Sequence, residues 1–268
     1  MLWKRLTAYG LPLSGVGLRR LCLLWLFLLP PQHAVCSQDL LVAVAANVQF
    51  AMEALQTAFM EESGLQIKTI VGSSGKLTAQ IENGAPFDLF LSADMKYPRE
   101  LYRAGLAVDT PRVYARGALV LWSLTGLDLD RDIPAILNDP AVGKIAVADP
   151  RLAPYGAEAL QVLQFYGIFE TASPKLVYGR SIAQVNQYIT LQTVAVGLTA
   201  KSVVLSPELQ ETGAWIAIDP RAYSPIDQGA VILKHGRDNR PEAARRFYAF
   251  LFSSPAQAIF SRYGYELP

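Results

Sequence analysis

Residues 40–94 read LLVAVAANVQFAMEALQTAFMEESGLQIKTIVGSSGKLTAQIENGAPFDLFLSAD. The uninterrupted apolar run 40–45 predicts a buried strand. Apolar residues then recur at the spacing of one helix face, at Val48, Met52, Leu55 and Phe59. Gly64 stands where that helix has to end, and residues 66–71 predict a second strand. The segment therefore indicates a strand–helix–strand unit.

The same alternation continues along the chain. A turn at 72–75 leads into a short helix that Gly84 ends, and residues 87–92 predict a third strand. Further runs of strand length follow, with helical patterns between most of them, at 144–148, 176–178, 194–199, 214–218 and 229–234. Strands that alternate with helices are typical of α/β proteins. We predict an α/β fold of two lobes with mixed, mostly parallel sheets and a hinged ligand cleft between them.

Two long extended stretches, 113–123 and 225–234, suggest paired crossings between the lobes. On this interpretation residues 38–117 plus 229–268 form lobe 1, and residues 118–228 form lobe 2. A single doubly wound domain is the alternative that the pattern leaves open.

The first 37 residues have the layout of a secretory signal. A basic region precedes the nine apolar residues 21–29 (LCLLWLFLL), which Pro30 and Pro31 end. Nine helical residues span only about 14 Å, too little for a hydrocarbon core of about 30 Å. Small residues follow, so we expect a signal peptide over 1–37, cleaved after Cys36 or after Ser37, and export of the mature protein.

Composition excludes several classes of function. All four charged residues of the leader are basic, so the rest of the chain has more acidic than basic residues, and we expect no nucleic-acid partner. Both cysteines and His33 lie in the leader, which leaves His235, in the loop-like stretch LKHGRDNRP, as the one mature histidine. We interpret His235 as a surface residue. A thiol nucleophile and a multi-histidine metal site are therefore not expected, and we predict a protein that is not an enzyme.

Four segments share a strand, a small or polar turn and a helix start. They are 45–47 (AAN), 72–75 (GSSG), 149–156 (DPRLAPYG) and 179–182 (GRSI). A helix start presents unpaired N–H groups and a partial positive charge, so several starts that converge make an anion site without any cationic side chain. Taken singly, each segment is better explained as an ordinary helix cap than as a binding site.

Taken together, the segments resemble the periplasmic molybdate-binding proteins of bacterial ABC importers, over residues 40–268. The resemblance rests on VAVAANV (42–48), VGSSGKLTAQIENGAPFDLFLSAD (71–94), ADPRLAPYGAEAL (148–160) and GRSIAQVNQ (179–187). The family has a two-lobed fold and holds a tetrahedral oxyanion with neutral donors.

The resemblance implies candidate ligand residues in each of the four turns. It implies Asn47 in the first turn, Ser73 or Ser74 in the second, the hydroxyl of Tyr155 in the third and the backbone N–H of Ile182 in the fourth. Two further positions depart from the family pattern and are possible contacts: Ala46 stands where a hydroxyl donor is common, and Thr199 where many members carry tyrosine.

The function that the resemblance implies is capture of molybdate or tungstate in the periplasm for an inner-membrane ABC permease and its ATPase. It implies a monomer with no cofactor and no catalytic residue. Two alternatives stay open. One is a binding protein for another oxyanion such as sulfate. The other is an exported serine hydrolase that uses a serine of residues 72–75, although the chain lacks the G-x-S-x-G pattern there.

Overall fold

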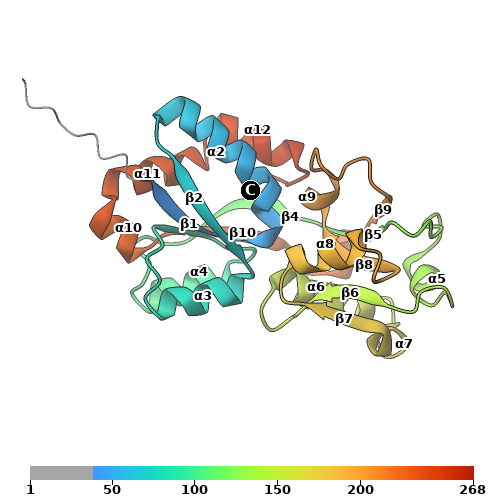
Figure 1. Cartoon of the computed structure of the whole chain (residues 1–268). Helices are drawn as coiled ribbons and strands as arrows, with labels where there is room; N and C mark the ends of the chain where they lie inside the picture. Colours follow the sequence, from blue (N-terminus) through green and yellow to red (C-terminus); the bar gives the residue numbers. More distant parts are fainter. Residues whose placement is uncertain (1–38) are drawn as a thin grey trace, which may run out of the picture. The chain divides into compact units, whose positions relative to one another are not determined.

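The computed structural model describes residues 39–268, and the predicted signal segment 1–37 lies outside them. The described chain builds two five-stranded sheets (Figure 1). In spatial order, the first sheet consists of β2 (Ile67–Gly72), β1 (Leu40–Ala45), β3 (Leu89–Leu91), β10 (Ile226–Ile232) and β4 (Arg112–Gly117). The second consists of β7 (Leu176–Gly179), β6 (Ile145–Ala148), β8 (Val196–Ala200), β5 (Leu119–Ser123) and β9 (Ala214–Ala217). Both belong to one compact unit, residues 37–268.

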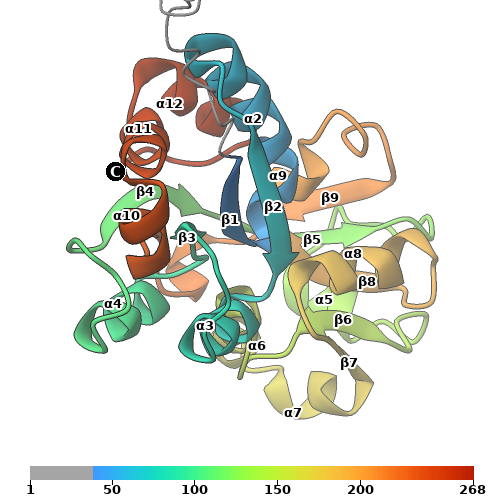
Figure 2. The ribbon, with the colours of Figure 1, turned by 60° about the vertical axis from the view of Figure 1, so that its left-hand side comes forward.

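Helices cover both faces of the first sheet, with α2, α11 and α12 on one side and α3 and α4 on the other (Figure 2). Their bounds are α2 Gln49–Ser63, α3 Ser74–Glu82, α4 Lys96–Arg103, α11 Pro241–Phe250 and α12 Ser254–Arg262. In β1, Val42 and Val44 pack into the α2 side and Ala43 into the α3 side. Because both faces of β1 are covered, its sequence is continuously apolar rather than alternating.

The second sheet packs against α6 (Pro154–Phe165) and α8 (Ile182–Thr190). The remaining helices are short: η1 Ala46–Val48, α5 Ile133–Leu137, α7 Phe169–Ala172, η2 Ser173–Lys175, α9 Lys201–Val204, η3 Pro220–Ala222 and α10 Lys234–Asn239. The core around the second sheet extends as far as Ala45, Ala46 and Ala93, which belong to the first-sheet side. In residues 39–268 no helix has the length and apolar content needed to cross a membrane.

Pairing in each sheet is mixed, as predicted. β1 pairs in parallel with β2 and β3, and β6 pairs in parallel with β7 and β8. The other half of each sheet is antiparallel, around β10 and around β5. The parallel share is therefore smaller than expected, because the strands that carry the chain between the sheets enter them in the opposite direction.

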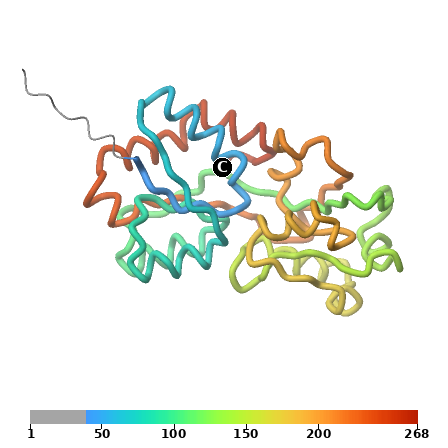
Figure 3. Tube along the Cα trace, in the orientation of Figure 1, coloured from blue at the N-terminus to red at the C-terminus, as the bar shows by residue number. Residues whose placement is uncertain are grey.

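The chain passes between the sheets at two neighbouring places (Figure 3). Only Ala118 separates β4 from β5, and β10 begins at Ile226, directly paired with Gly117. The predicted crossings thus correspond to strands that meet at one junction. The predicted lobe boundaries, 117/118 and 228/229, stay a prediction.

His235 is partly exposed, at 32% of its side chain, but it does not lie in a loop as predicted. It lies in α10, and its Nδ1 is 3.0 Å from Oδ1 of Asp88, which has no exposed surface. Asp88 also accepts hydrogen bonds from the Leu41 N–H (2.7 Å) and from Nη1 of Arg240 (3.1 Å). The buried carboxylate therefore joins the start of β1 to α10 and Arg240, and sequence spacing alone gives no sign of that contact.

Asp88→Ala should lower the free energy of unfolding by about 3 kcal/mol, because it leaves a buried N–H and a largely buried guanidinium without their acceptor. Urea unfolding of the two proteins measures the difference. Asp238→Ala is the control. The side chains of Asp238 and Arg237 are 46% and 44% exposed, so the loss of their ion pair should lower the free energy of unfolding by less than about 1 kcal/mol. Equal losses in the two variants would contradict the structural role of Asp88.

Candidate functional site

One small pocket lies where the four predicted turns meet. Its cavity volume is about 10 Å³, and it is lined by Ala45, Ala46, Asn47, Gly72, Ser73, Ser74, Ala93, Ala153, Pro154, Tyr155 and Ile182. These residues come from the ends of strands and the starts of helices on both sheets. Five of the predicted ligand residues, together with Ala46, thus share a single pocket, and their role as ligands stays a prediction.

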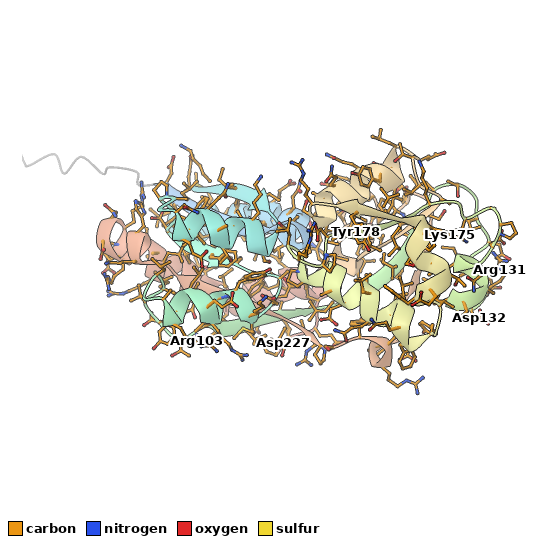
Figure 4. All side chains as sticks on the ribbon, turned by 90° about the horizontal axis from the view of Figure 1, so that it is seen from below. Arg103, Arg131, Asp132, Lys175, Tyr178 and Asp227 are labelled. Carbon is orange, nitrogen blue, oxygen red and sulfur yellow. The ribbon has the colours of Figure 1, made fainter. Side chains whose placement is uncertain are left out.

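The pocket lining carries no ionisable side chain apart from the phenol of Tyr155. Figure 4 labels the charged residues Arg103, Asp227 and Lys175, and none of them lines the pocket. Lys76 and Arg180, which flank two of the turns in the sequence, are both exposed. Any anion in this pocket would therefore be held by hydrogen-bond donors and helix dipoles rather than by a counter-charge.

The second turn supplies two buried hydroxyl groups. Ser73 precedes α3 with extended backbone (φ −74°, ψ 149°), but its hydroxyl makes no capping bond and has no partner at all. Ser74 Oγ accepts a hydrogen bond from the Ala93 N–H at 3.0 Å, which leaves its own proton free to be donated. Four other buried polar atoms in residues 39–268 also lack a partner, but only Ser73 among them lines this pocket, where a ligand would satisfy its hydroxyl.

Main-chain N–H groups complete the donor set. Asn47, Ser74, Tyr155 and Ile182 all lie in the first turns of η1, α3, α6 and α8. First-turn N–H groups have no acceptor within their own helix. The approach of α6 to β6 requires Gly156, because a Cβ there would overlap the carbonyl of Ala148.

The third turn closes directly on the second. The Gly75 N–H donates to the Leu152 carbonyl at 2.9 Å, and the Tyr97 hydroxyl donates to the Arg151 carbonyl at 3.3 Å. A Cβ on Gly75 would lie 2.7 Å from the Tyr97 hydroxyl and 3.1 Å from the Leu152 carbonyl oxygen. Glycine at position 75 thus allows the second and third turns to lie in direct contact beside the pocket.

The hydroxyl of Tyr155, which the family resemblance suggests as a ligand, makes contacts within the protein. It accepts a hydrogen bond from Nε2 of Gln228 (3.3 Å), contacts Gly117 and bonds with the side chain of Asn47. Burial raises the pKa of this phenol well above 10, with the Asn47 hydrogen bond a smaller opposing effect. The phenol is therefore neutral, and its own proton stays available because its oxygen accepts from Gln228, so its role as a ligand stays a prediction.

The side chain of Asn47 is likewise engaged within the protein. Its Nδ2 donates to Oε1 of Gln228 (2.8 Å) and to the Tyr265 hydroxyl (3.3 Å). Its carbonyl accepts hydrogen bonds from Ser202 and Tyr265, each at 2.7 Å. These bonds hold the first turn in place and leave the main-chain N–H of Asn47 as its free donor.

Thr199 is the one predicted contact that the structure does not bring to the pocket. It is fully buried in β8, and its hydroxyl donates to Oδ1 of Asn186 at 2.6 Å. Sequence reasoning, in turn, missed Gln228, Ser202, Tyr114 and Tyr265. The only signal for Gln228 was a lone amide within the extended run 225–234.

Comparison with known proteins follows the same residues. A family model for bacterial extracellular solute-binding proteins matches residues 40–266. The molybdate-binding protein ModA of Rhodobacter capsulatus is 38% identical over 228 residues, which is 85% of this chain and 88% of the relative. ModA of Azotobacter vinelandii is 37% identical over 235 residues, covering 87% and 92%.

Solved structures agree with these matches. The periplasmic molybdate-binding protein of Azotobacter vinelandii matches with a TM-score of 0.80 and 32% identity, over 86% of this chain and all of that one. A sulfate-binding protein of Mycobacterium tuberculosis matches with a TM-score of 0.69 at 15% identity, a likeness of fold alone. The predicted α/β fold of two lobes is thereby confirmed.

Stability should fall in alkali because of the buried phenols. Burial raises the pKa of Tyr265 to about 12, so the unfolded chain, with a tyrosine pKa of about 10, releases that proton first. The contribution of Tyr265 is present below about pH 10 and is lost as the pH rises toward about 12, at about 1.4 kcal/mol per pH unit.

Urea unfolding at several pH values in this range gives the free energy of unfolding as a function of pH. That free energy should fall less steeply with pH for Tyr265→Phe than for the parent. Tyr102→Phe, at a 42% exposed ring, controls for the loss of one tyrosine from the surface. If the free energy of unfolding falls equally steeply with pH in the parent and in Tyr265→Phe, the loss of stability does not come from Tyr265.

Proposed function

The chain belongs to the family of bacterial extracellular solute-binding proteins, and on that premise we propose that its pocket captures molybdate, or tungstate, for an ABC importer. The observation that carries the proposal is the buried, unpartnered hydroxyl of Ser73 in a pocket whose other donors are first-turn N–H groups. The two ModA relatives support molybdate as the cargo.

The proposed mechanism is desolvation of the dianion, offset by fixed hydrogen bonds. The donors are the N–H groups of Asn47, Ser74, Tyr155 and Ile182, with the hydroxyl of Ser73 or Ser74. Each bond to an ionised acceptor contributes about 1.5–3 kcal/mol. Four helix starts add their partial positive charge. No covalent step is part of the proposal.

Selectivity would arise from size and from protonation. The oxygens of molybdate stand further from the central atom than those of sulfate, so a pocket fitted to molybdate leaves sulfate with long hydrogen bonds. A protonated phosphate oxygen would place its O–H against donors that cannot accept it. Neutral donors thus discriminate by geometry, whereas a buried cation would attract all three anions.

The cellular setting follows from the same family. We place the mature protein in the periplasm as a monomer, after removal of residues 1–37, with an inner-membrane permease and its ATPase as partners. Lobe 1 (38–117 plus 229–268) and lobe 2 (118–228) would open at the junction of β4, β5 and β10 to admit the anion.

A serine hydrolase is the weaker proposal. Ser73 and Ser74 would need a base, and the pocket lining holds no histidine, aspartate or glutamate. Within residues 39–268 the one histidine is His235, which pairs with Asp88 near the start of β1, at the far end of that strand from Asn47.

Molybdate should raise the melting temperature of the protein strongly, whereas sulfate and phosphate should raise it little. Binding to the folded state alone adds about 4 kcal/mol at a thousandfold excess over Kd. A thermal-shift series with molybdate, tungstate, sulfate and phosphate measures this. An equal shift with sulfate would refute selection by size, and no shift with molybdate would refute the proposed cargo.

Ser73→Ala and Ser74→Ala should separate the two candidate hydroxyls. Ser73 has no internal hydrogen bond to lose, so Ser73→Ala should leave stability unchanged and weaken molybdate binding by about 1–3 kcal/mol if its hydroxyl is a donor. Ser74→Ala also strands the Ala93 N–H, so it should cost about 1 kcal/mol of stability as well.

Calorimetric titration and urea unfolding give the two quantities for each serine variant. Thr57→Ala, a surface hydroxyl on α2, is the control for stability and binding alike. Parental affinity in both serine variants would remove the second turn from the site.

A further inference from the structure

Gln228 is a fully buried amide at the junction between the two sheets. It lies in β10, at the point where the register with β4 shifts between Gln228 and Gly229. A buried amide is costly unless its oxygen and nitrogen are bonded. A side chain so placed has to be explained by the groups that it joins.

All the partners of Gln228 are neutral side chains from other elements. Its Oε1 accepts hydrogen bonds from Nδ2 of Asn47 (2.8 Å) and from the hydroxyl of Tyr114 (2.9 Å). Its Nε2 donates to the hydroxyl of Tyr155 at 3.3 Å. The carboxamide of Gln228 therefore accepts at one atom and donates at another. A carboxylate of the same reach has no donor, and a hydroxyl would have to accept and donate at a single atom, so neither reproduces this geometry.

Two of these partners belong to the pocket, and they come from different sheets. Asn47 follows β1 of the first sheet, and Tyr155 opens α6 beside the second. Their side chains meet at Gln228, beside Gly117 where β4 passes into β5. A link at this junction can set the spacing of the two donor segments around the pocket.

We propose that Gln228 is a positioning residue for the anion site: it does not line the pocket, but its carboxamide holds Asn47 and Tyr155 so that their main-chain N–H groups converge. The inference rests on the proposed function. Neutrality matters here, because a carboxylate at this place would put a negative charge behind a pocket for a dianion.

The test is a binding cycle with molybdate as the probe. Gln228→Met keeps the length and removes every hydrogen bond, so Kd should rise by about 10-fold or more, with a faster dissociation rate. Tyr155→Phe should raise Kd as well. If the Tyr155 hydroxyl acts through Gln228, the double variant should bind about as weakly as Gln228→Met alone.

The control variant is Ser123→Ala, a buried hydroxyl of the second sheet that donates to the Ala195 carbonyl at 2.7 Å and does not line the pocket. It should lower the melting temperature and leave Kd unchanged. Should Gln228→Met fail to fold, Tyr114→Phe removes one donor from the same oxygen outside the pocket, and it should raise Kd by about 2–5-fold.

Each outcome has one meaning. A parental Kd in Gln228→Met, or in Tyr114→Phe where that variant replaces it, overturns the positioning role even if stability falls. Additive effects in the double variant mean that the Tyr155 hydroxyl contacts the anion independently, which also overturns it. Failure of the parent protein to bind molybdate overturns the proposed function instead, so the two failures are distinguishable.

Discussion

A pocket without a counter-charge can hold an anion only if its hydrogen-bond donors are held in fixed directions around the anion. Water solvates a dianion with many mobile dipoles. A protein that replaces them with a few neutral hydrogen-bond donors can compete only if no free energy is lost in orienting those donors. In this chain the requirement is met by backbone geometry. Four strands end at the pocket, and the helix that follows each strand begins with N–H groups that its own carbonyls cannot reach.

Rigidity behind those donors comes from a second layer of neutral side chains. Asn47, Gln228, Tyr155, Tyr114 and Tyr265 satisfy one another's hydrogen bonds without exposing them to water. Such a network rigidifies a site only when every member is bonded, because each unpaired group in a low dielectric is costly. The contrast with Ser73 is informative, since its hydroxyl alone in this region lacks a partner among the described residues.

The sequence predicts those features of the protein that depend on neighbours along the chain. The strand–helix alternation, the end of α2 at Gly64 and the four turns all follow from local patterns, and the structure brings the turns to one pocket. The ionic contacts of Asp88 and the bonds of Gln228 join residues far apart in sequence, such as Asn47 and Gln228 at a separation of 181, so no local pattern encodes them. The direction of the Tyr155 hydroxyl belongs to the same class, because it depends on the space beside Gly117.

Four of the pocket-lining residues, Ala45, Ala46, Ala93 and Ala153, are alanines. Position 156 tolerates no side chain, and the polar lining residues are tied to partners or supply donors. The alanines have no side-chain hydrogen bond to lose, so a larger residue there would narrow the pocket without removing a donor, although it would have to be packed into a buried site. In evolution, substitutions at these four positions could therefore fit the pocket to a smaller oxyanion while its network of donors stayed the same.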